Sequence, residues 1–91
     1  MYPTRYMRLL RLKHGIPLSE LAIAARVTHQ RISQIELSSE PATSYHRALI
    51  AEAFAIIAEQ RGKDGEDLRR DLHRLEYSLL DFTEKENINE L

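Results

Sequence analysis

Apolar residues recur along the chain at the three- and four-residue spacings of amphipathic helices. Glycine and proline occur three times each, and they stand between the periodic stretches. The first four predicted helices cover residues 6–14, 18–25, 29–36 and 44–60. Gly15 can end the first helix in a left-handed conformation, Thr28 can cap the third, and Thr43 or Ser44 can cap the fourth. No alternating β pattern is present, so we expect an all-α fold of four to five helices.

A further apolar series follows the turn-forming residues 62–65. Its members alternate at spacings of four and three: Leu68, Leu72, Leu75, Leu79 and Phe82. This is the seam pattern of a coiled coil over about two heptads, and it predicts a leucine-rich helix through Phe82. We therefore divide the chain into a domain over 1–61 and a C-terminal leucine-rich helix with an acidic tail over 62–91.

Composition and charge narrow the class of protein. With 91 residues, 43% apolar and 30% charged, the chain has the composition of one small globular domain. The absence of cysteine excludes disulfides and thiolate metal sites. No apolar run is long enough to span a membrane, and we expect a cytoplasmic protein. The net charge of −1 combines +4 over 1–47 with −5 over 48–91, so the first half favours polyanions.

The segment between residues 20 and 36 carries the most specific motif. It reads ELAIAARVTHQRISQIE, two short helices joined by a tight link, which is a helix-turn-helix pattern. This string resembles the helix-turn-helix domains of the Cro/repressor family, also called the XRE family, and the likeness covers about half of the chain. The resemblance implies a compact, lambda-repressor-like domain that binds double-stranded DNA. It also implies a structural ion pair between Arg11 and Glu36.

Two positions depart from the family pattern. Arg26 occupies the link where glycine is usual, and a left-handed backbone there would cost about 1 kcal/mol. Either the turn is rebuilt or Arg26 is placed for a phosphate. Pro17 stands where the second helix usually has a capping hydroxyl.

In a helix-turn-helix protein the second helix of the motif enters the major groove. The side chains expected to read bases from its outer face are His29, Gln30, Ser33 and Gln34. The residues expected to contact phosphates are Ser19, Thr28, Arg31, Ser39 and Arg47. For each of these positions the alternative is an ordinary solvated polar side chain.

A single motif of this size reads few base pairs, so we expect a homodimer on a palindromic operator. The five apolar residues of the predicted seam are the candidate interface for a second copy or another partner. The alternative is that this segment folds back and completes a monomeric core.

No pattern of catalysis or cofactor binding is present. The four histidines match no metal-ligand spacing, and neither a glycine-rich phosphate loop nor a nucleophile elbow occurs. We therefore expect no enzyme, no metal and no cofactor. The favoured function is a dimeric transcriptional repressor. The alternatives are an antitoxin whose C-terminal helix binds a toxin, and an adaptor that binds protein; a partner of either kind, or an anti-repressor, would use the leucine face.

Overall fold

The computed structural model describes residues 4–38, 41–75 and 77–84 of the chain. Within them, five α-helices and one 3₁₀ helix account for most of the fold, beside one antiparallel pair of short strands. In chain order the elements are β1 (Thr4–Arg5), α1 (Tyr6–Lys13), α2 (Leu18–Ala25), α3 (His29–Leu37), α4 (Ser44–Gln60), η1 (Gly62–Asp64), α5 (Gly65–Leu75) and β2 (Phe82–Thr83). The all-α prediction is confirmed, and each of the first four helices has its predicted bounds to within one residue.

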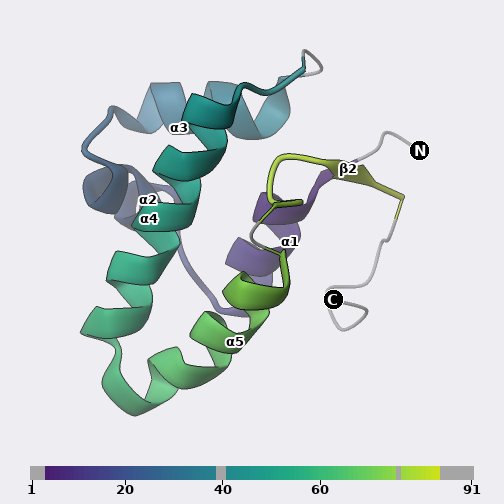
Figure 1. The fold of residues 1–91 in the computed structure, drawn as a ribbon. Helices are drawn as coiled ribbons and strands as arrows, with labels where there is room; N and C mark the ends of the chain where they lie inside the picture. The colour runs from purple at the N-terminus through teal and green to yellow at the C-terminus, as the bar shows by residue number, and fades with distance from the viewer. Residues whose placement is uncertain (1–3, 39–40, 76, 85–91) are drawn as a thin grey trace.

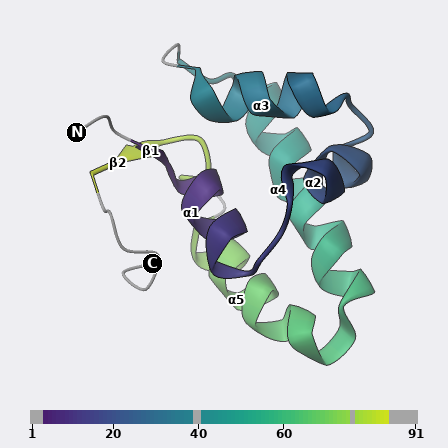
Figure 2. The same cartoon turned by 180° about the vertical axis from the view of Figure 1, so that it is seen from behind.

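The helices pack around α4 (Figure 1). It runs from α3 at one end of the molecule to η1 at the other, and α5 returns from η1 toward α1. From behind, α2 lies against α4 (Figure 2). At the start of α5 the backbone of Gly65 lies close to the backbone of Ala58 in α4. A Cβ atom added at Gly65 would stand 1.8 Å from the carbonyl oxygen of Ala58, so only glycine allows this close approach.

One buried apolar cluster joins all five helices. Its fully buried members include Leu10, Leu21, Ile32, Ile50, Phe54, Ile57 and Leu68. Each side chain of this size contributes about 1.5–3 kcal/mol when it is removed from water. Because the cluster contains residues of both predicted segments, 1–61 and 62–91, the two segments share one core in the part of the chain that the structure describes.

The predicted helix through Phe82 is wrong. The helix ends at Leu75, and two turns follow, in which Ser78 N–H donates to Leu75 and Asp81 N–H donates to Ser78. The physical reason lies at the start of α1, where no side chain caps the helix. Instead, the N–H of Met7 donates to the carbonyl oxygen of Leu79 at 2.8 Å. The returning segment thereby satisfies donors that a helix N-terminus leaves open.

The leucine seam is likewise corrected. Leu68, Leu72 and Leu79 are buried within this chain, and Leu75 packs against the same cluster. Phe82 is 41% exposed and lies in β2, where its partner is Arg5 of β1. These leucines fill the core of their own chain, so they do not form a coiled-coil face. The short β1–β2 pair has no signature in the hydrophobic pattern because each strand has only two residues.

Candidate nucleic-acid interface

The link between α2 and α3 is a tight turn. Arg26 ends α2 with φ 59° and ψ 38°, which is the left-handed conformation. The N–H of Val27 donates to the carbonyl oxygen of Ala22 at 3.1 Å and closes the end of α2. Thr28 then caps α3, because its hydroxyl oxygen accepts a hydrogen bond from the N–H of Arg31 at 3.0 Å. The chain therefore accepts the left-handed arginine rather than rebuilding the turn.

Apolar side chains fix the angle between the two helices. Leu21 of α2 and Ile32 of α3 are fully buried, and Ile35 of α3 is also in the core. Ala22 is buried as well, and its small side chain lets the two helices approach. Because one side of α3 is used for this packing, the opposite side faces outward.

The predicted ion pair between α1 and α3 is present. Arg11 donates to both carboxylate oxygens of Glu36, from Nε at 3.0 Å and from Nη2 at 2.8 Å. Its remaining nitrogen, Nη1, donates to the carbonyl oxygen of Ile16 at 3.1 Å. Both side chains are buried, so each charge is neutralised by a partner of fixed geometry. The pair holds the C-terminal part of α3 against α1.

The outer face of α3 carries the four predicted base-reading residues. His29, Gln30 and Gln34 are exposed and Ser33 is partly exposed. Together with Leu37 and Ser38 of the same helix end, they line one shallow hollow on the surface. Among the described side chains that line this hollow, none is a carboxylate. The face is open and mostly polar.

The predicted phosphate-contacting residues differ in their exposure and in their partners within the chain. Ser19 is exposed near the start of α2, and the hydroxyl oxygen of Thr28 is engaged in the α3 cap. Arg47 lies over the ring of Tyr77, with its guanidinium carbon 5.6 Å from the ring centre. Ser39 lies outside the described residues.

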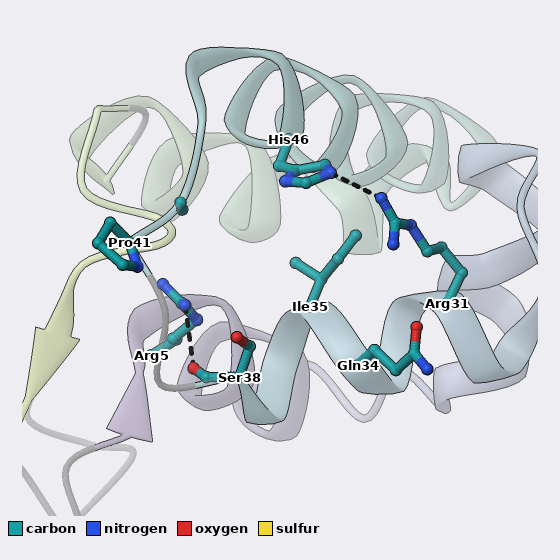
Figure 3. Close-up of a pocket in the computed structure, with 8 residues that line it drawn as sticks. Arg5, Arg31, Gln34, Ile35, Ser38, Pro41 and His46 are labelled. Carbon is teal, nitrogen blue, oxygen red and sulfur yellow. Dashed lines mark hydrogen bonds between the residues drawn. The ribbon is translucent and has the colours of Figure 1, made fainter.

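Arg31 has a partner that the sequence pattern did not reveal. Its Nη2 lies 3.0 Å from Nε2 of His46 in the first turn of α4 (Figure 3). The arginine donates in this contact, because a guanidinium has no acceptor. His46 thus holds the guanidinium of Arg31 at the junction of α3 and α4. Helical periodicity gives no signal for this contact, since the two residues lie 15 positions apart.

A small cavity lies between α3 and the start of α4 (Figure 3). Arg5 lines it together with Arg31 and His46. It is buried, and its guanidinium donates to the carbonyl oxygens of Leu80 and Ser38, the latter at 3.0 Å. The guanidinium also lies 4.3 Å from the centre of the Phe82 ring. Burial lowers the pKa of Arg5, and the nearby charge of Asp81 opposes that shift. The sequence pattern does not reveal this arginine because its hydrogen-bond partners lie 33 and 75 positions away along the chain.

The described helices include none that combines the length and the apolar character needed to cross a membrane. No protein-family model, curated protein or solved structure shows a significant match to this chain. The function must therefore be inferred from the chemistry of the chain itself.

Proposed function

We propose that this chain is a sequence-specific DNA-binding protein that regulates transcription, with α3 placed in the major groove. One observation carries the proposal: the outer face of α3 presents His29, Gln30 and Gln34 to solvent, in a hollow whose described lining residues include no carboxylate. The opposite face of the same helix is held by the core and by the Arg11–Glu36 pair. Such a helix is fixed in position and free on one side.

The side chains on this face suit the edges of base pairs. A glutamine amide can donate to N7 and accept from the N6 amino group of adenine, in a two-point contact. Gln30 and Gln34 lie one turn apart, so their amides can reach different base pairs along the groove. His29 at the start of α3 can donate to the O6 or N7 of guanine. These contacts would make the binding sequence-specific.

Contacts to phosphates would come from groups beside this face. Arg31 is exposed, and His46 orients it toward the α3–α4 junction. No side chain caps the N-terminus of α2, so its first N–H groups can point at an anion. The acidic residue in that first turn, Glu20, is paired with Arg61 at 3.3 Å, which reduces its repulsion of a phosphate.

The proposal includes two copies on a palindromic site, because one helix of nine residues reads only a few base pairs. The second copy would not use the buried leucines of α5. Occupation of an operator that overlaps a promoter would then repress transcription.

Selection of duplexes from a random pool tests the proposal directly. We expect the wild type to enrich one sequence with two-fold symmetry. Gln30→Ala should then lower affinity for that sequence by about 1–3 kcal/mol and relax the preference at one or two base pairs. Gln60→Ala is the matched control, because Gln60 is an exposed glutamine at the other end of α4. It should leave the preference at every base pair unchanged.

Salt dependence provides the second readout. Affinity should fall with salt concentration with a log–log slope of about −0.9 per phosphate contacted. The absence of any enriched sequence, or a flat response to salt, would overturn the proposal.

A further inference from the structure

We propose that Leu37 recognises the methyl group of a thymine in the bound DNA, and so determines specificity at one end of the α3 site. This inference rests on the DNA-binding function proposed above. Leu37 is the last residue of α3, and it is 68% exposed although it is apolar. Its significance lies in where it stands, since single exposed leucines are common on protein surfaces.

Leu37 stands on the same face of α3 as the polar base-reading residues. It follows Gln34 by three positions and Gln30 by seven, so the three side chains form one row along the helix. It also lines the same surface hollow as these residues. The apolar residues of α3 that build the core, Ile32 and Ile35, are buried on the other side. The fold therefore does not use Leu37 for packing.

The end of α3 that carries Leu37 is held in place from both sides. Ser38, the next residue, donates its N–H to the carbonyl oxygen of Gln34 at 2.9 Å. The carbonyl oxygen of Ser38 accepts from the buried Arg5 at 3.0 Å. Glu36, the preceding residue, is fixed by Arg11. A contact made by Leu37 would thus need little ordering of the backbone, which favours binding.

The major groove offers an apolar side chain one distinct target. The edges of adenine, guanine and cytosine present hydrogen-bond donors and acceptors there, while thymine adds its C5 methyl group. Three residues of α-helix advance about 4.5 Å, a little more than one base-pair step of about 3.4 Å. Leu37 would therefore meet a thymine about one step beyond the base pair that Gln34 contacts. Because it has no polar group, it would favour thymine over the other three bases.

The test removes the methyl group from the DNA and the leucine from the protein. Each thymine of the duplex selected by the wild type is replaced in turn by deoxyuridine, which has the same hydrogen-bonding edge without the methyl group. For the wild type we expect one such replacement to lower affinity about fourfold, the equivalent of one buried methyl group. Leu37→Ala should bind the thymine and uracil duplexes equally. Its thermal unfolding should match that of the wild type, because the side chain is exposed.

Leu12→Ala is the matched control. Leu12 is an exposed leucine on α1, away from the α3 hollow. This variant should keep the fourfold loss on the uracil duplex. If the wild type selects a duplex but no replacement lowers affinity, or if Leu37→Ala shows the same loss as the wild type, the inference about Leu37 is overturned and the proposed function stands. If the wild type selects no duplex, both are overturned.

Discussion

Two buried carboxylates attach different helices to α1, and they do so with different chemistry. Glu36 of α3 is held by Arg11, with Arg8 at 3.4 Å from the same carboxylate. Asp71 of α5 is held by Lys13 and His14, whose nitrogens both lie 2.8 Å from one carboxylate oxygen. The first site positions the proposed reading helix, and the second attaches the helix that closes the core.

The difference between the two sites lies in which partners of the carboxylate reach water. At the Glu36 site Arg11 is 10% exposed and the more distant Arg8 is 42% exposed. At the Asp71 site His14 is 10% exposed, while Lys13 and Arg74 are 30% and 53% exposed. The cation that contacts both oxygens of Glu36 is therefore buried, whereas two of the cations that contact Asp71 reach water. Planar arginine also matches both carboxylate oxygens, which lysine cannot do. The site at α3 is therefore the more rigid and the more costly to break.

Glu36→Gln should have the largest effect on stability. It leaves the buried Arg11 uncompensated, and loss of one partner of a buried pair costs about 3 kcal/mol or more. The free energy of unfolding from urea titrations, followed by circular dichroism, measures this loss. Glu52→Gln on the exposed side of α4 is the control and should change it little. A loss from Glu36→Gln no greater than that of the control would show that the pair does not hold α3.

Asp71→Asn should cost less, about 2 kcal/mol at pH 7, because two of its partners, Lys13 and Arg74, can turn to solvent. Burial by itself raises the pKa of the Asp71 carboxyl, but hydrogen bonds and charge from Lys13 and His14 outweigh it, so the pKa is lowered overall. The charged carboxylate thus favours the folded state above the ordinary pKa of 3.8, and this contribution is lost as pH falls below about 4.

Unfolding titrations at pH 7 and pH 3 measure that dependence. The difference in unfolding free energy between the wild type and Asp71→Asn should be largest at pH 7 and shrink at pH 3. A difference that is the same at both pH values would mean that the charge of Asp71 does not stabilise α5.

The two sites also show what the sequence could and could not predict. The pair of Arg11 and Glu36 is predicted by the family resemblance that the segment 20–36 carries, and helical spacing predicts the bounds of the first four helices. Asp71 was not singled out, because its partners are 57 and 58 positions away and no local pattern joins them. The same limit applies to the end of α5. The leucine spacing continues through residue 79, beyond the end of α5. The segment after α5 is not helical because its carbonyl oxygens accept hydrogen bonds from the open N–H groups at the start of α1.

The smallest expected effect concerns the turn between α2 and α3. Arg26 and Gly15 both have left-handed backbones, with φ of 59° and 62°, after α2 and α1 respectively. Arg26→Gly should therefore raise the free energy of unfolding by about 1 kcal/mol, because the strain from Cβ is removed. Gly15→Ala should lower it by about the same amount. An added Cβ at Gly15 meets nothing within 4 Å, so that loss would come from backbone conformation alone.

If Arg26→Gly raises the free energy of unfolding and Gly15→Ala lowers it, the backbone of Arg26 at the α2–α3 turn is strained. The affinity of Arg26→Gly for the selected duplex then shows why an arginine stands there. A more stable variant that binds DNA more weakly, with a smaller salt slope, would mean that the charge of Arg26 contacts a phosphate. Equal affinity would mean that the arginine has no part in binding. A loss of stability in Arg26→Gly would contradict the strain itself, and would show that side-chain contacts of Arg26 outweigh the cost of its backbone.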